Sequence, residues 1–154
     1  MASLNWCKGK KKGIRLVMPN APLAEEYMHL AQETLELCPL IKGRSELWLS
    51  TMLYYAEYFA AYAVLCKIGI RSEIHDCTIE VCRLLETQNI FPIGTTVQLE
   101  EDKKLRIDNQ YYLKSRPVRF DYNSLLEFIS TIKSRMDRLT SDEAEAIRKI
   151  IERE

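Results

Sequence analysis

The sequence predicts an all-α fold, an antiparallel bundle of five or six helices. Leu, Ala, Glu, Lys and Ile are abundant, whereas Gly and Pro number only five each, and this composition favours helices. Apolar residues recur at steps of three and four along most of the chain, and no stretch has the strict alternation of a half-buried strand. With 154 residues, 47% of them hydrophobic, the chain suits one packed globule.

The charges balance, with 22 Lys and Arg against 22 Asp and Glu. A chain without net charge has no global field to attract nucleic acid or a membrane surface, so any anion site must be local. The first 17 residues are nevertheless basic, with Lys8, Lys10, Lys11, Lys12 and Arg15. We interpret them as a solvated arm, with contact to phosphates as the alternative. The expected organisation is a basic N-terminal arm over 1–20 and a helical domain over 21–154.

The five cysteines have no metal-binding spacing. Cys77 and Cys82 are five positions apart, and no histidine pair completes a zinc set. We therefore expect buried, reduced thiols, no metal and no other cofactor. The N-terminus lacks the apolar segment of a secretory signal. Together these features predict a cytoplasmic protein.

Helix boundaries can be assigned in order from the start and stop signals. Asn20 can cap a first helix, which is expected to end before Pro39. Ser45 can cap a second helix, which runs to Ile68 and closes at Gly69. Four further helices are expected at Cys77–Glu86, at Val97–Leu113, at Tyr122–Leu139 behind an Asp121 cap, and after a capping box at Thr140–Glu143.

The second helix has apolar residues on two sides. One stripe contains Trp48, Met52, Tyr55, Phe59, Tyr62 and Cys66, and the other contains Leu47, Thr51, Tyr54, Tyr58, Ala61 and Leu65. One stripe faces the core, and the other faces either more core or a second copy of the chain. A membrane span is disfavoured because Glu57 lies at the centre, where an acid costs about 3 kcal/mol. We expect Glu57 to pair with a tyrosine hydroxyl or a basic group.

The stretch "GIRSEIHD", Gly69 to Asp76, places Arg71 and His75 four positions apart. One interpretation is a polar junction between helices, in which Ser72 caps the next helix and Glu73 or Asp76 pairs with Arg71. The other is a phosphate site, because arginine offers a fixed fork of donors to phosphate oxygens and histidine transfers protons near neutral pH. The only other histidine, His29, is interpreted as a residue of the surface or core edge.

The segment "STMLYYAEYFAAYAVLCKIGIRSEIHD" resembles the centre of the small prokaryotic HEPN proteins, in which a helix with a Tyr-Tyr-Ala signature precedes a Gly-Ile turn and a histidine. "LAEEYMHLAQETLE" is similar to the first helix of that family, and "LRIDNQYYL" to its later Leu-Arg then Tyr segment. The resemblance extends over residues 23–139.

The resemblance implies an all-α homodimer that associates through the central helix, here Tyr54, Tyr58 and Tyr62. It also implies that Arg71 and His75 are the catalytic and phosphate-binding residues, and Tyr112 is expected to add a hydroxyl. Three residues separate Arg71 from His75, whereas active family members have four to six.

Many members of the family are metal-independent endoribonucleases of the toxin type, neutralised by a minimal nucleotidyltransferase. Others bind RNA or nucleotides without cutting. The alternative for this chain is a non-catalytic adaptor that binds a protein partner such as a nucleotidyltransferase.

Overall fold

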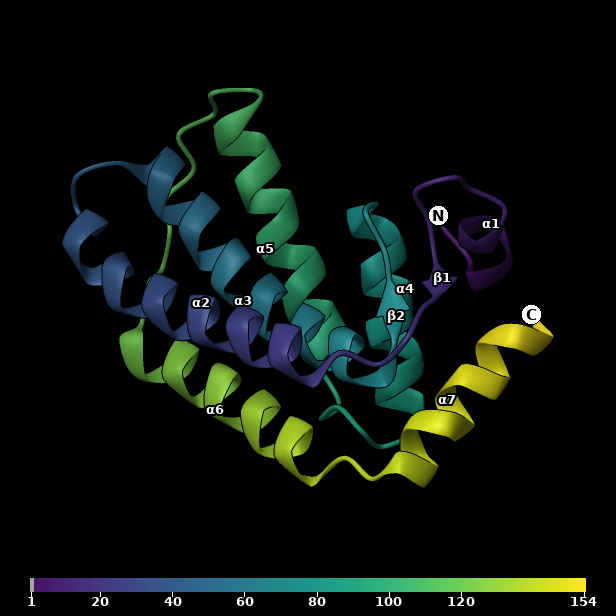
Figure 1. The fold of residues 1–154 in the computed structure, drawn as a ribbon. Coiled ribbons are helices and arrows are strands. Elements are labelled where there is room, and N and C mark those ends of the chain that lie inside the picture. Colours follow the sequence, from purple (N-terminus) through teal and green to yellow (C-terminus); the bar gives the residue numbers. More distant parts are fainter. Residues whose placement is uncertain (1) are drawn as a thin grey trace.

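The computed structural model describes residues 2–154, of which 71% are helical and 3% lie in strands. The all-α class is therefore confirmed. The elements are α1 (Leu4–Lys8), β1 (Arg15–Leu16), α2 (Ala21–Ile41), α3 (Glu46–Ile68), β2 (Ile70–Arg71), α4 (His75–Thr87), α5 (Thr95–Gln110), α6 (Tyr122–Arg138) and α7 (Ser141–Arg153) (Figure 1). Six of these helices correspond to predicted ones, and the seventh is the short α1.

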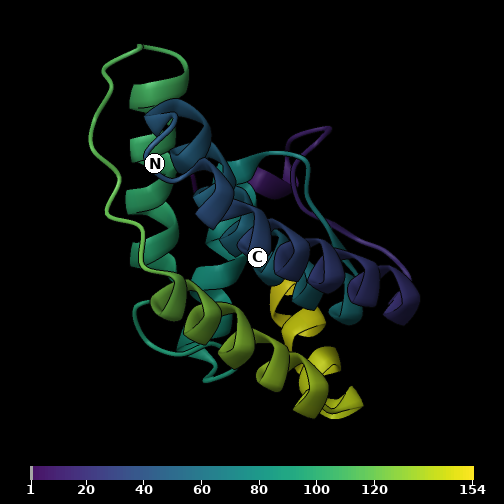
Figure 2. The ribbon, with the colours of Figure 1, turned by 90° about the vertical axis from the view of Figure 1, so that its left-hand side faces the viewer.

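Helix α3 is the centre of the molecule. It packs against α2, α5 and α6 and makes smaller contacts with α4 and α7. In Figure 1, α2 runs alongside α3 and α6 lies below them, whereas Figure 2 shows α5 crossing the direction of α2 and α6. Fifteen of the 23 residues of α3 are buried, which explains its apolar character on more than one side.

Several predicted helix ends are confirmed, because local capping chemistry determines them. The Ser45 hydroxyl accepts a hydrogen bond from the Trp48 amide at 3.2 Å, and Gly69 closes α3 with a φ of 94°. Asp121 accepts from the Asn123 amide at 3.0 Å. Thr140 and Glu143 form the expected capping box at the start of α7.

Several predicted ends are wrong, including both ends of α5, which runs from Thr95 to Gln110 rather than from Val97 to Leu113. Helix α2 continues through Pro39 to Ile41, since a proline in the last turn removes one hydrogen bond while the next turn still closes through Lys42 N–H to Cys38 O at 3.0 Å. Helix α4 begins at His75 rather than Cys77. Ser72 does not cap it, because the residue before the helix is Ile74 and the Ser72 hydroxyl donates to the Ile74 carbonyl at 3.1 Å.

The basic N-terminal segment is not a free arm. Cys7 and Ile14 are buried, and β1 pairs antiparallel with β2, which sets Arg15 opposite Arg71 and Leu16 opposite Ile70. The Glu73 amide also donates to the Lys12 carbonyl at 2.9 Å. The backbone is therefore docked on the loop before α4, while the side chains of residues 10–12 remain exposed.

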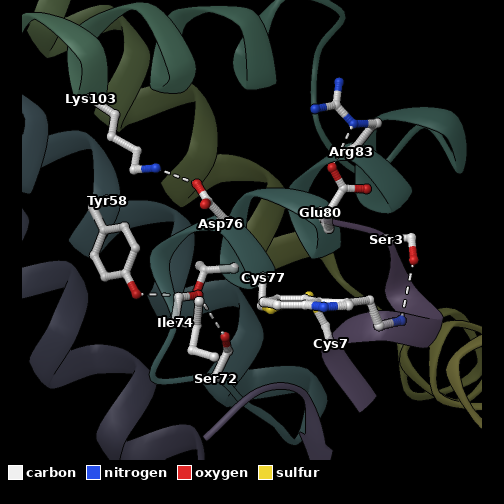
Figure 3. The surroundings of a disulfide bond; sticks show 12 residues. Ser3, Cys7, Tyr58, Ser72, Ile74, Asp76, Cys77, Glu80, Arg83 and Lys103 are labelled. Carbon is white, nitrogen blue, oxygen red and sulfur yellow. Dashed lines mark hydrogen bonds and ion pairs between the residues drawn. A yellow bond between two sulfur atoms is a disulfide. The ribbon is translucent and has the colours of Figure 1, made fainter. Parts of the chain in front are cut away.

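A disulfide joins Cys7 of α1 to Cys77 of α4 (Figure 3). The expectation of reduced thiols is therefore wrong for these two residues and correct for Cys38, Cys66 and Cys82, which are free and buried. The pairing links positions 70 residues apart, so cysteine spacing along the chain could not reveal it. It also removes the cysteine argument for a cytoplasmic location, because disulfides are typical of oxidising compartments.

Glu57 lies fully buried in the middle of α3, but its neighbours differ from those expected. Its Oε2 accepts from Gln98 Nε2 at 2.5 Å, and its other oxygen, Oε1, is buried without a hydrogen-bond partner among the described residues. Burial and the adjacent Asp102 carboxyl both raise the pKa of Glu57. This environment therefore favours the protonated form of the carboxyl group. Within residues 2–154, no helix is both long enough and apolar enough to cross a membrane.

Candidate functional site

His75 is the first residue of α4, and the tyrosines of α3 hold its ring. The Tyr54 hydroxyl lies 2.9 Å from Nδ1 of His75. The Tyr58 ring stacks on the imidazole at 4.3 Å between centroids, with 15° between the planes. Tyr55 presents an edge at 5.8 Å. The three rings fix the position and plane of the imidazole. A binding site needs such fixed side chains to place a hydrogen-bonding atom against a ligand.

Arg106 of α5 shares two of these tyrosines with His75. Its guanidinium carbon lies 4.9 Å from the centroid of the Tyr54 ring and 5.4 Å from that of Tyr55. Tyr111 lies on it at 5.8 Å and is itself 64% exposed. Rings at these distances stabilise a cation through their quadrupoles. Helices α3, α4 and α5 thus bring a histidine and an arginine to the same two aromatic rings.

The electrostatics of this cluster keep His75 neutral at pH 7. Burial lowers its pKa first, the charges of Arg106 and Lys103 lower it further, and Asp76 opposes them, with a resulting value of about 4. Asp76 forms an ion pair with Lys103, and Figure 3 shows the two side chains turned toward each other. Burial raises the pKa values of the Tyr54 and Tyr58 hydroxyls, so both phenols remain protonated.

The arrangement leaves one side of the imidazole free for a ligand. Nδ1 is occupied by the Tyr54 hydroxyl, whereas Nε2 has no hydrogen-bond partner in the described part of the chain. The tautomer follows from the direction of that bond: if the phenol donates to Nδ1, then Nε2 carries the proton and can donate to an anion. The start of α4 also has no side-chain cap, so its first amides remain available to a negatively charged group.

Arg71, the other half of the predicted pair, has different neighbours. Its side chain is 58% exposed and forms a 3.6 Å ion pair with Glu73, one of the two partners expected for it. It lines a groove of about 460 Å³ together with Tyr27 and Tyr62. The tyrosines in contact with His75, which are Tyr54, Tyr55 and Tyr58, do not line this groove. The structure therefore brings Arg106 rather than Arg71 to the tyrosines that hold His75.

Tyr112 and the predicted dimer residues are also resolved in position. Tyr112 is 68% exposed, and the ammonium of Lys114 lies 5.7 Å from its ring. The tyrosine that contacts Arg106 is instead its neighbour Tyr111. Tyr54 and Tyr58 are buried within the chain, and Tyr62 is half-buried and accepts from the Ser72 amide at 3.3 Å. His29 is exposed on α2, as expected.

Arg106 is the site residue that sequence reasoning missed. One signal was available: Arg106 follows Leu99 by seven positions, which places it on the buried side of α5. A cation at such a position needs a specific partner, because burying an unpaired charge is unfavourable. Recognising that signal requires knowing which side of α5 is buried.

An apolar surface adjoins the site. We call it the α2–α3 face. It consists of exposed or half-buried residues of the two helices: Leu23, Tyr27, Leu30 and Leu37 on α2, and Trp48, Met52, Tyr55, Phe59 and Tyr62 on α3. Tyr27 contacts Tyr62 and Phe59 across the two helices, at 4.9 and 6.1 Å between ring centroids. Tyr55 belongs both to this face and to the environment of His75, so the face reaches the site.

Comparison of the chain with protein-family models, with curated proteins and with solved structures found no match.

Proposed function

We propose that this chain is a HEPN-like protein that binds RNA or nucleotide phosphate at His75. The observation that supports the proposal most strongly is the environment of the imidazole. Its Nδ1 is held by Tyr54, its Nε2 has no hydrogen-bond partner among residues 2–154, and its ring is stacked on Tyr58 at the start of a helix that has no side-chain cap. Such a ring presents one directed hydrogen-bonding atom beside free backbone amides, which suits a phosphate oxygen.

If the chain is an enzyme, the reaction proposed for the same site is metal-independent cleavage of RNA. Attack of a 2′-hydroxyl on the adjacent phosphate needs a base for that hydroxyl and an acid for the leaving oxygen. A neutral imidazole with a pKa of about 4 can take the hydroxyl proton only at an unprotonated Nε2, which requires the tautomer whose Nδ1–H donates to the Tyr54 oxygen. A bound phosphate places a negative charge beside the ring and raises that pKa. Cleavage therefore requires the bound phosphate to raise the pKa of His75 toward 7. The proposed scheme uses no cofactor.

The proposed protein is a homodimer, and the α2–α3 face is the proposed interface. Tyr54 and Tyr58 face the core of their own chain, so of the residues first assigned to the interface Tyr62 alone belongs to this face. Trp48 is 58% exposed at one end of it. Large exposed apolar surfaces mark protein interfaces, and this one reaches the site through Tyr55. Dimerisation would therefore bring the two His75 sites toward a shared surface.

The alternative function is a non-catalytic adaptor. The same α2–α3 face favours it, because an apolar surface can bind a different protein, such as a nucleotidyltransferase, in place of a second copy. In that case His75 and Arg71 only shape the junction before α4. We keep the cytoplasmic location as part of the proposal, although the Cys7–Cys77 disulfide is more typical of an oxidising compartment.

The decisive experiment is RNA binding and cleavage by the purified chain in EDTA. Wild type is compared with His75→Ala, with Arg71→Ala, and with His29→Ala as the matched control for removal of an imidazole. Binding that His75→Ala loses and His29→Ala keeps supports the proposal, and cleavage with the same pattern identifies the enzyme. A wild type that neither binds nor cuts RNA overturns the phosphate-binding function and favours the adaptor.

A further inference from the structure

Arg106 is a buried cation without a matching anion. The residue is only 6% exposed, and no carboxylate lies within 4 Å of its guanidinium in the part of the chain that the structure describes. Its Nε is buried with no hydrogen-bond partner among the described residues, and Nη1 donates one long hydrogen bond, 3.3 Å to Gln110 Oε1. A guanidinium offers five donors, so most of its hydrogen-bonding capacity is unused.

The carboxylates nearest in sequence are engaged elsewhere. Asp102, one turn earlier on α5, interacts with Glu57. Asp108 pairs with Arg116 at 2.6 Å and with Lys114 at 3.3 Å. The aromatic rings around Arg106 stabilise its charge but accept none of its directional N–H bonds. An unpaired buried charge is unfavourable, and the structure retains one at this position.

We propose that Arg106, rather than Arg71, is the arginine that holds the phosphate at the His75 site. This inference rests on the proposed phosphate-binding function and specifies its geometry. Arg106 and His75 contact the same Tyr54 and Tyr55 rings, from α5 and α4 respectively. A phosphate between them accepts charge-assisted bonds from the guanidinium and one bond from the imidazole.

The surroundings of Arg106 and the charges near His75 favour the binding of an anion. Tyr111, whose ring centroid lies 5.8 Å from the guanidinium carbon of Arg106, is 64% exposed, so one neighbour of the guanidinium is a surface side chain. The groups that face His75 are Tyr54, Tyr55 and Tyr58 of α3, Asp76 of α4, and Lys103 and Arg106 of α5. Asp76 is the only carboxylate in this set, and Lys103 neutralises it, which leaves the positive charge of Arg106 for the ligand.

The test is a titration of the 154-residue chain with inorganic phosphate, followed through the histidine ring signals in NMR spectra. The chain has two histidines, and exposed His29 provides the reference in the same spectrum. Phosphate is expected to shift the His75 signals with saturation and to raise the His75 pKa, because it adds a negative charge beside the imidazole.

Arg106→Met and Arg71→Met are the matched variants. Methionine keeps an unbranched apolar stem of the length that arginine has up to Nε, but removes the charge and the donors. We expect phosphate affinity to fall at least about tenfold in Arg106→Met, the loss expected for a charge-assisted pair, and to change less than about twofold in Arg71→Met. Removal of an unpaired buried charge also predicts that Arg106→Met unfolds at the same or a higher urea concentration than wild type. Arg106→Lys, which keeps the charge but not the fork, provides a second variant with an expected loss of about threefold or more.

The other outcomes overturn the inference in distinguishable ways. If Arg71→Met loses phosphate affinity and Arg106→Met keeps it, the proposed function stands and its arginine is Arg71. If the Arg106 variants change the oligomeric state while phosphate affinity stays constant, the guanidinium binds a carboxylate of a second copy. If neither inorganic phosphate nor RNA binds the wild type, the proposed function fails together with the inference.

Discussion

Removal of the Cys7–Cys77 disulfide is expected to destabilise the protein more than removal of any two of its free thiols. The bond closes a loop between residues 70 positions apart, and both cysteines are fully buried. Loop-closure entropy for that length corresponds to about 4 kcal/mol of stabilisation. Domains of this size have a free energy of unfolding of about 5–15 kcal/mol, so the loss is a large fraction of the total.

Urea unfolding of three proteins measures this effect: oxidised wild type, Cys7→Ala with Cys77→Ala, and Cys38→Ala with Cys66→Ala as the matched control. With a urea dependence of about 2 kcal/mol per molar, the midpoint falls by about 2 M in the first variant. The control loses only the cost of two small cavities. In denatured but unreduced wild type, three thiols are expected to titrate, since Cys38, Cys66 and Cys82 are free. Five titrating thiols, or equal midpoints for the two variants, would refute the reasoning.

Three further predictions concern the buried carboxyl, the apolar face and the site histidine. Folding raises the pKa of Glu57 above its ordinary 4.5. Protonation of Glu57 therefore contributes fully to the free energy of unfolding below pH 4.5, and this contribution is lost as the pH rises through the pKa of the folded state. Glu57→Gln should therefore remove most of the decline in urea midpoint toward alkaline pH, and an unchanged decline would contradict the assignment. Trp48→Glu should convert the proposed dimer to a monomer in light scattering, whereas Ile93→Glu, at a 93% exposed position outside the α2–α3 face, should not; a wild type that is already monomeric would exclude this interface. Without phosphate, the His75 ring signals should titrate near pH 4 rather than near the ordinary 6.5 of a histidine, and a midpoint near 6.5 would contradict the burial argument.

Much of the fold could be predicted because its determinants are local. Capping at Ser45, Asp121 and Thr140 depends on residues within one turn, and the closure of α3 depends on Gly69 alone. The disulfide and the pairing of β1 with β2 depend on contacts between the N-terminus and the α3–α4 junction. Such contacts leave no periodic signal in the sequence. The N-terminal segment therefore resembles an arm in the sequence, although in the structure its backbone is docked on the loop before α4.

The candidate site was predicted only in part, for the same reason. His75 was identified from its position beside Gly69 and Arg71 in one short segment. Its actual neighbours come from α3 and α5 as well as from α4, and a spacing of four residues did not reveal that Arg71 would line a groove with Tyr62. The position of Arg106 depends on how α5 packs on α3. Distances along the chain identify residue types suited to phosphate chemistry, but helix packing decides which of them meet.

The most direct test of the central claim is the effect of a short single-stranded RNA, a uridine tetranucleotide, on the ring signals of the two histidines. We expect the RNA to shift the His75 signals with saturation at low salt and to leave those of His29 unchanged. Signals of His75 that stay constant at saturating RNA, or that move no more than those of His29, would contradict phosphate binding at this site.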